Sequence, residues 1–256
     1  MSSTWFSIRD AKPAEPVEIL IYDQIGKDWF GGDGVSSKEF AEALKGIDNK
    51  RQIRVCINSP GGNVWDGLAI YNMLRARKEN VTCRVDGVAA SIASVIALGG
   101  GKLEMPKNSL MMIHDPSGLV MGNAEDMREM ADQLEKHADI LAGIYAEKSG
   151  KSREKMRSLM RDETWFTGDE AQAMGLCDFA MEPVKIAANF DFKAFRRVPA
   201  ALAKTNNTPP QAAAGQHTPN KMQTEKILAL LAKHGKSLTA EATEEQILAA
   251  LSALVT

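Results

Sequence analysis

Cysteine is scarce in this 256-residue sequence, which has three, each in a separate apolar segment. Cys56, Cys83 and Cys177 are too far apart to suggest a zinc site or a disulfide framework, and they are typical of buried free thiols in a reducing compartment. The sequence also lacks a basic N-terminal segment followed by an apolar stretch, so we expect no signal peptide. Since no apolar run is long enough to span a membrane, we expect a cytoplasmic protein.

An excess of charge of one sign is lacking too. The chain has 31 Lys and Arg against 33 Asp and Glu, a net charge of −2, which gives no electrostatic reason to expect nucleic acid or an acidic membrane as a partner. No phosphate loop, dinucleotide fingerprint, zinc-ligand spacing or HExxH motif is present, so we expect neither a cofactor nor a metal. The G-x-S-x-G motif is absent as well, which excludes the nucleophile elbow of the α/β-hydrolases.

Strand-like and helix-like segments alternate along the rest of the chain. β-Branched apolar runs predict strands, and apolar residues every three or four positions predict helices. The predicted strands are 17–24, 52–59, 80–87, 102–105, 109–114 and 176–181, and the main predicted helices are 36–47, 64–77, 123–148, 153–162 and 167–175. This order predicts an α/β fold with a largely parallel sheet. The unusually long helix 123–148 either covers the core or projects toward a neighbouring subunit.

The composition changes after Val198. Residues 199–221 are rich in Pro, Ala, Thr, Asn and Gln without an apolar period, which predicts a flexible linker. The sequence of residues 222–256 predicts two short amphipathic helices, which we expect to be too small to fold alone. We therefore expect one domain over residues 1–198, then the linker, then a small helical tail that docks on the domain or serves assembly.

Two of the four histidines, His114 and His137, lie within the expected domain over residues 1–198. His114 ends the apolar strand LMMI and precedes Asp115 and Pro116. A histidine at a strand end, where side chains meet a cleft, can act as a base; the alternative is a structural histidine. His137 lies among charged residues on the long predicted helix and is interpreted as a solvent-facing residue.

Small residues surround Ser91 in the stretch DGVAASIASVIALGGG, residues 86–101. Ser91 is either a small space-filling residue bonded to the preceding turn, or a nucleophile at a helix start whose N–H groups stabilise an oxyanion. We interpret Ser94 as packing. The turn SPGG, residues 59–62, is similarly either a tight turn or a place where glycine N–H groups face a ligand.

Four motifs, taken together and in order, resemble the Clp protease proteolytic subunit (ClpP) family. These motifs are INSPGG, DGVAAS, MMIHDP and ETWFTGDEAQAMGLCD. They look most like the Clp-like enzymes of phages and prophages, often assigned as head maturation proteases. The resemblance covers about Val17 to Met181. It implies the ββα superhelix shared by Clp proteases and crotonases, with 123–148 as a handle helix between stacked rings. It also implies a location in the cytoplasm of a bacterial host or phage-infected cell.

The resemblance implies a serine endopeptidase that cleaves a polypeptide substrate through an acyl-enzyme. Ser91 would be the nucleophile and His114 the general base. The substrate would lie extended beside a strand. The remaining implied positions are Gly62 and Ile92 for the oxyanion hole, and Gly61, Asp115 and Pro116 for the substrate groove.

The third catalytic residue is where the sequence departs from the family, which has an aspartate there. Counting back from Gly175 places Glu163 at this position, with Asp162 one residue earlier. We expect Glu163 to orient the imidazole, with Asp162 as the alternative acid. If residues 161–163 form only a charged turn, the site would be a Ser–His dyad.

The resemblance also implies binding partners, and three other classes of protein remain as alternatives. The family forms rings, so we expect a homo-oligomer, either a heptameric ring or a stacked 14-mer, together with an ATPase unfoldase or a capsid or scaffold protein. A crotonase-like acyl-CoA enzyme shares the scaffold but needs no serine nucleophile. A Ser–Lys protease would need a lysine that is not evident here. A non-catalytic ring or scaffold module would need neither Ser91 nor His114.

Overall fold

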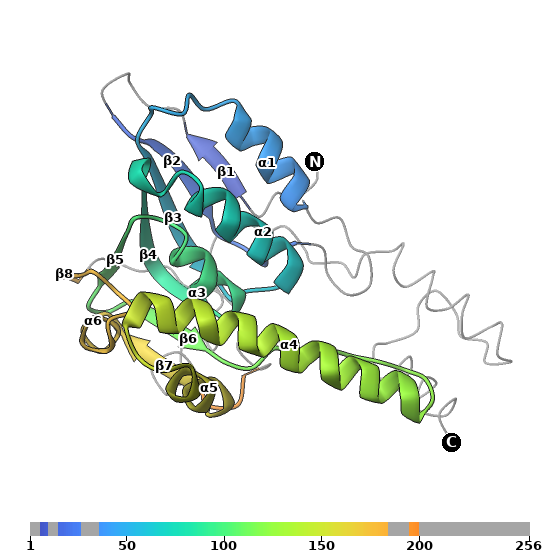
Figure 1. Ribbon diagram of the computed structural model, residues 1–256. Coiled ribbons are helices and arrows are strands. Elements are labelled where there is room, and N and C mark those ends of the chain that lie inside the picture. Colours follow the sequence, from blue (N-terminus) through green and yellow to red (C-terminus); the bar gives the residue numbers. More distant parts are fainter. Residues whose placement is uncertain (1–5, 10–14, 27–35, 184–194, 200–256) are drawn as a thin grey trace, which may run out of the picture. The chain divides into compact units, whose positions relative to one another are not determined.

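The computed structural model describes residues 6–9, 15–26, 36–183 and 195–199 (Figure 1). Within these ranges the strands are β1 (Phe6–Arg9), β2 (Val17–Ile21), β3 (Ile53–Ser59), β4 (Val81–Ala90), β5 (Lys102–Pro106), β6 (Leu110–Ile113), β7 (Thr164–Thr167) and β8 (Phe179–Met181). The helices are α1 (Ser37–Lys45), α2 (Val64–Arg75), η1 (Lys78–Asn80, a 3₁₀ helix), α3 (Ile92–Ala97), α4 (Ala124–Ser149), α5 (Arg153–Arg161) and α6 (Gly168–Met174).

One mixed sheet organises the described residues. Its main path runs β1-β2-β3-β4-β5-β8, and every pair on it is parallel except β1 with β2. A second branch leaves the long strand β4, whose last residues pair with β6 in parallel, and β6 pairs with β7 antiparallel. The α/β fold with a largely parallel sheet is therefore confirmed.

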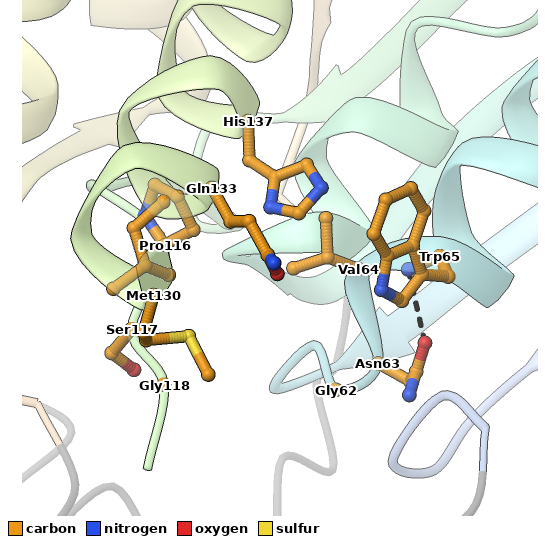
Figure 2. A pocket seen from close by; sticks show the side chains of 11 residues that line it. Gly62, Asn63, Val64, Trp65, Pro116, Ser117, Gly118, Met130, Gln133 and His137 are labelled. Carbon is orange, nitrogen blue, oxygen red and sulfur yellow. Dashed lines mark hydrogen bonds between the residues drawn. The ribbon is translucent and has the colours of Figure 1, made fainter. Parts of the chain in front are cut away.

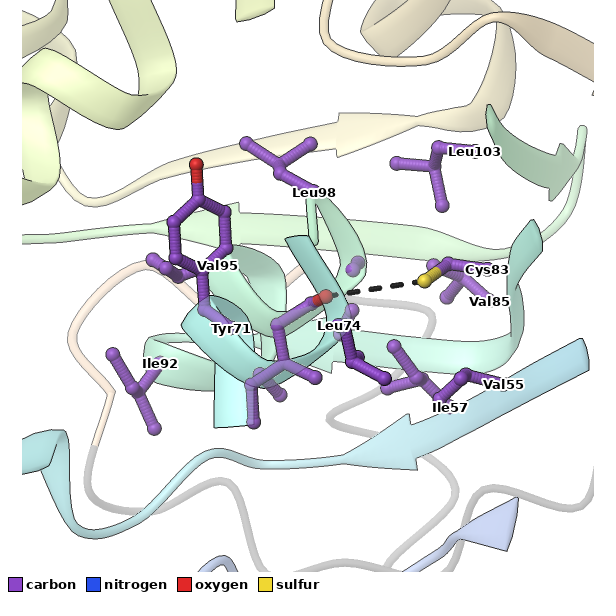
Figure 3. Packing of buried hydrophobic residues seen from close by; sticks show 14 of the residues in the cluster. Val55, Ile57, Tyr71, Leu74, Cys83, Val85, Ile92, Val95, Leu98 and Leu103 are labelled. Atoms are coloured by element: carbon purple, nitrogen blue, oxygen red, sulfur yellow. Dashed lines mark hydrogen bonds between the residues drawn. The ribbon is translucent and has the colours of Figure 1, made fainter. Parts of the chain in front are cut away.

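The main core lies between this sheet and the helices. Figure 3 shows Val55 and Ile57 of β3 and Val85 of β4 in one cluster with Leu74 of α2 and Val95 of α3. All five side chains are fully buried. Because β3 is buried along almost its whole length, it reads in sequence as a continuous apolar run rather than an alternating one.

Helices α2 and α3 lie close together where Gly67 of α2 meets Ile92 of α3. A Cβ atom on Gly67 of α2 would lie only 2.1 Å from Cγ1 of Ile92 on α3, so no larger residue fits there. Ile92, Val95 and Ile96 supply the buried bulk of α3. Within the stretch around Ser91, a Cβ atom on Gly99 would lie 3.0 Å from Cβ of Leu74 on α2, so close packing against α2 favours a small residue at that position.

Helix α4 begins after a capping box in which the Asn123 side chain accepts backbone N–H groups and Asp126 bonds back to the Asn123 N–H, as the sequence predicts. Its buried residues all lie in the C-terminal half: Ala138, Leu141, Ala142 and Tyr145. Figure 1 shows the N-terminal half extending beyond the sheet. Across the described ranges, no helix has both the length and the apolar character needed to cross a membrane.

Several features differ from the sequence-based expectations or fall outside the described residues. Strands β1 and β7 were not predicted, because each has only four residues, which is too short a run for its pattern to indicate a strand by itself. The three cysteines are buried and free, as predicted, and burial raises the pKa of Cys83 to about 12. The predicted linker, apart from Pro199, and the predicted helical tail lie outside the described residues.

Candidate active site

Strand register brings the main candidate residues to one end of the sheet branch. In β4 and β6, Ala90 pairs with Met112, so Ser91 and His114, which directly follow these parallel strands, emerge side by side. In β6 and β7, Ile113 pairs with Thr164. Because β7 runs antiparallel, Glu163 lies at the same end, immediately before β7.

Ser91 has a strained backbone conformation for a residue with a side chain, with φ 55° and ψ −130°. Its N–H donates to the Met112 carbonyl at 3.0 Å, which continues the β4–β6 pairing by one residue. Its carbonyl accepts hydrogen bonds from the Ser94 N–H at 3.0 Å and the Ser94 hydroxyl at 2.6 Å. Strain of this kind, held in place by surrounding bonds, is common at reacting residues.

The Ser91 hydroxyl meets His114 directly. Ser91 Oγ lies 2.7 Å from Nε2 of His114, within the range expected of a nucleophile and its base. Burial lowers the pKa of His114, the negative charges of Glu163 and Asp115 oppose this effect, and Arg196 adds to it. A lowered pKa keeps the imidazole neutral at neutral pH, the state in which it can accept the hydroxyl proton.

The two candidate acids have different surroundings. The Glu163 side chain is buried, and its charge is the strongest of those that act on His114. Its carboxylate oxygens accept hydrogen bonds from the backbone N–H groups of Arg196 at 2.9 Å and Arg197 at 2.6 Å. Asp162 ends α5 with its side chain 56% exposed and 3.8 Å from Arg197. Of the two carboxylates, Glu163 is the one whose charge acts on His114.

The turn after β3 lies against the nucleophile. A Cβ atom on Gly61, where φ is +100°, would lie 2.7 Å from Cβ of Ser91. A Cβ atom on Gly62 would lie 2.2 Å from the Ile25 carbonyl oxygen. The bridge between these segments uses the Gly61 carbonyl and the Asn63 N–H, each 2.8 Å from its partner on Ile25, so the Gly62 N–H is outside this ladder. These contacts explain why both positions need glycine.

A cavity of about 380 Å³ opens beside this turn. Figure 2 shows the rings of Trp65 of α2 and His137 of α4 next to one another in its lining, with their centroids 4.3 Å apart in an edge-to-face arrangement. Its lining residues are Gly62, Asn63, Val64, Trp65, Pro116, Ser117, Gly118, Met130, Gln133, Leu134 and His137. The cavity therefore joins the Gly62 turn, the segment after His114, and one stripe of α4.

The predicted substrate-groove residues take different places. Pro116 lines the cavity, and Gly61 packs on Ser91. The Asp115 carboxylate instead pairs with Arg157 of α5 at 2.9 Å. His137 faces the cavity, although its charged sequence neighbours favour a solvent-facing position. The three- and four-residue spacing of Met130, Gln133, Leu134 and His137 was the signal available for this stripe. Within the described residues, no group of three or more His, Cys, Asp or Glu side chains is placed to hold a metal ion.

Comparisons with known proteins cover this whole site. The family model described as Clp protease matches residues 36–183. The ATP-dependent Clp protease proteolytic subunit 1 of Chlamydia abortus is 34% identical over 159 residues, which are 58% of this chain and 83% of that protein. An ATP-dependent Clp protease proteolytic subunit of Bacteroides fragilis is 36% identical over 137 residues, 53% of this chain and 66% of that protein. The ATP-dependent Clp protease proteolytic subunit 2 of Bacillus licheniformis is also 36% identical over 137 residues, 53% of this chain and 72% of that protein.

Proposed function

Because this chain belongs to the Clp protease family and is a serine endopeptidase, we propose that Ser91 and His114 perform its peptide-bond cleavage. The observation that carries the proposal is the 2.7 Å contact between Ser91 Oγ and Nε2 of His114. A serine hydroxyl is a weak nucleophile unless a neighbouring base takes its proton. A histidine held neutral by burial is suited to that role.

The reaction is acyl transfer in two steps. Ser91 Oγ attacks the peptide carbonyl carbon while Nε2 of His114 takes the hydroxyl proton, and the same proton then passes to the leaving amine as the C–N bond breaks. Water next attacks the Ser91 ester with His114 again as base. The ester bond breaks, the peptide acid leaves, and Ser91 regains its proton.

The charge that develops on the carbonyl oxygen needs donors close to Ser91. We assign this role to the backbone N–H groups of Gly62 and Ile92. Ile92 is the first residue of α3, so its N–H has no acceptor within that helix. Gly62 lines the cavity, and its N–H is not used in the bridge to Ile25. Fixed backbone donors of this kind favour the transition state over the ground state.

Glu163 is proposed as the acid that supports His114. Its negative charge acts on the imidazole and stabilises the imidazolium form that exists during each step. The carboxylate does so by its position and charge, while its hydrogen bonds go to backbone N–H groups.

The cavity next to Gly62 is proposed as the place where a substrate side chain is held. Its lining combines apolar side chains such as Trp65 and Met130 with polar side chains such as Gln133 and His137. A polypeptide lying extended past Ser91 would pass Pro116, which lines the same cavity. Unfolded segments fit this arrangement, since an extended backbone is needed to reach the serine.

Helix α4 is proposed as a contact between subunits in a heptameric ring or a stacked 14-mer. Met127 is 52% exposed and lies in the N-terminal half of α4. No residue in that half of the helix is buried. Leu119 and Met121, just before the helix, are 63% and 89% exposed. Clustered exposed apolar side chains favour a protein–protein contact. Sedimentation velocity at micromolar concentration tests this proposal, and a monomer would contradict it.

A role in phage head maturation, in the cytoplasm of an infected cell, is proposed on the motif resemblance alone. The substrate would then be a capsid or scaffold protein. Incubating the enzyme with a folded capsid precursor tests this against the alternative of an ATPase-fed enzyme. Cleavage without an added unfoldase supports the head-maturation proposal, and cleavage only with one contradicts it.

The catalytic proposal is tested by comparing wild type with Ser91→Ala, His114→Ala and Ser94→Ala on an unfolded polypeptide. We expect the first two variants to be inactive and Ser94→Ala to remain active. Ser94 is fully buried, and its hydroxyl lies 2.7 Å from that of Tyr145, so its loss lowers the free energy of unfolding by about 1–3 kcal/mol. Equal cleavage by wild type and Ser91→Ala would contradict the proposal.

A further inference from the structure

The β4–β6–β7 branch has a second apolar face, on the side opposite the main core. Phe195 and Val198, which lie far along the chain, pack against this face. Successive residues of a strand point to opposite faces, and in β4 and β6 one set, including Ala89 and Met111, enters the main core. The other set forms a separate buried cluster of Val88, Ala90 and Met112. The partly buried residues packed on this cluster are Leu110, Trp165, Phe195 and Val198.

Phe195 also reaches the catalytic histidine. Its ring lies edge to face against His114, with ring centroids 5.7 Å apart at 83°, and against Trp165 at 5.9 Å and 83°. Trp165 belongs to β7 and is thereby part of the same wall. The His114 ring thus contacts both the Ser91 hydroxyl and the Phe195 ring.

The next two residues of the segment hold Glu163. Both carboxylate oxygens are bonded, one to each consecutive N–H of Arg196 and Arg197. Glu163 has φ +48°, a left-handed conformation that is unfavourable for a glutamate. Two hydrogen bonds to a charged carboxylate are strong enough to offset this cost and to fix its position.

The segment lies outside the cavity, since none of its residues is among the lining residues, so it does not occupy the proposed substrate site. It also follows the region that matches the family model, which ends at residue 183. We propose that Phe195–Val198 is a positioning segment of the active site: Phe195 fixes the His114 ring, and the N–H groups of Arg196 and Arg197 fix the Glu163 carboxylate. This inference rests on the proposed function of Ser91 and His114.

We expect the Phe195 ring to influence the pKa of His114 and so the pH dependence of the reaction rate. The charged groups that act on His114 are Glu163, Asp115 and Arg196, and burial is the largest influence on its pKa. Removing the Phe195 ring exposes the imidazole, which raises the pKa of His114 toward its ordinary value. Because the base must be neutral, the acidic limb of the rate profile then moves to higher pH.

The test measures the rate at which a small fluorophosphonate labels Ser91, as a function of pH, in the full-length protein. One matched pair is Phe195→Ala and Phe195→Leu, since leucine keeps much of the apolar cover. The other is Arg197→Pro, which removes the N–H donated to Glu163, and Arg197→Ala, which keeps it. Arg196 stays intact throughout, because its charge acts on His114.

We expect Phe195→Ala to shift the acidic limb to higher pH and Phe195→Leu to follow wild type. Arg197→Pro should slow labelling by about 10- to 100-fold while Arg197→Ala stays near wild type, because small misplacements of catalytic groups cost this much. A role in folding alone would lower the melting temperature and the labelled fraction without moving the pH profile. Superimposable pH profiles for Phe195→Ala and Phe195→Leu, with equal rates for the two Arg197 variants, would overturn the inference and leave the proposed function standing. An unlabelled wild-type Ser91 would overturn both.

Discussion

The Ser91 hydroxyl and Nε2 of His114 lie 2.7 Å apart although 23 positions separate the two residues in sequence. Two parallel strands bring them together, because each residue directly follows its strand and the pairing of Ala90 with Met112 leaves the two strand ends only one residue apart in register. The 3.0 Å bond from the Ser91 N–H to the Met112 carbonyl fixes the serine in this register. The contact between the proposed nucleophile and its proposed base is thus a consequence of sheet register.

Activity should persist at a pH below the ordinary pKa of histidine. Burial lowers the pKa of His114 below 6.5, and only the neutral imidazole accepts the Ser91 proton. The acidic limb of kcat/KM should therefore lie below pH 6.5, with activity present above the limb and lost beneath it. A pH profile with a small ester substrate measures this, and a limb above pH 7 would contradict the burial argument.

Glu163→Gln should cost more activity than Asp162→Asn. Removing the Glu163 charge takes away the stabilisation of the imidazolium, for which we expect a loss in kcat of at least about 10-fold, equivalent to some 1.4 kcal/mol. It also lowers the pKa of His114 further, since that charge raises it, so the acidic limb moves to lower pH. Asp162→Asn, at a side chain 56% exposed, should leave both quantities unchanged. The reverse ranking would assign the role to Asp162.

Gly61→Ala should be far more harmful to activity than Gly150→Ala. Both glycines have positive φ, but a Cβ on Gly61 would lie 2.7 Å from Cβ of Ser91, whereas a Cβ on Gly150 meets nothing within 4 Å. We expect Gly61→Ala to lower kcat by about 100-fold through displacement of the nucleophile. Gly150→Ala should lower the free energy of unfolding by only about 1–2 kcal/mol at unchanged kcat. Equal kcat values for the two variants would contradict the close approach at Ser91.

His137→Ala should affect substrate binding rather than chemistry. His137 lines the cavity and packs on Trp65, so its loss should raise KM for a peptide several-fold with little change in kcat. Ile140→Ala is the matched control, because Ile140 is 50% exposed on the same helix and is not among the residues that line the cavity. If both variants gave the wild-type KM, the cavity would not be the substrate site.

The sequence was sufficient to predict much of the fold and to select the two residues, Ser91 and His114, whose side chains the structure places in contact. Apolar runs such as 53–59 and the capping box at Asn123 gave the strand and helix order, because these signals are local. Ser91 and His114 were selected by motif order, since neither is distinctive alone.

The features that the sequence did not predict depend on contacts between segments that are far apart in the chain. The β7 strand has four residues and is defined by its pairing with β6 rather than by its own pattern. The cavity-facing position of His137 follows from how α4 packs beside α2. The contacts of Phe195 and the Arg196 and Arg197 N–H groups lie beyond the motifs, and backbone donors leave no trace in residue identity.

The most direct test of the account is active-site labelling of the wild-type protein with a fluorophosphonate, with the adduct located by mass spectrometry. Because attack on phosphorus needs the same activated hydroxyl as attack on a peptide carbonyl, we expect a single adduct on Ser91. Labelling should be retained in Ser94→Ala and lost in His114→Ala. An adduct on another residue, or an unlabelled Ser91 in a folded wild-type protein that still cleaves polypeptide, would contradict the assignment of Ser91 as the nucleophile.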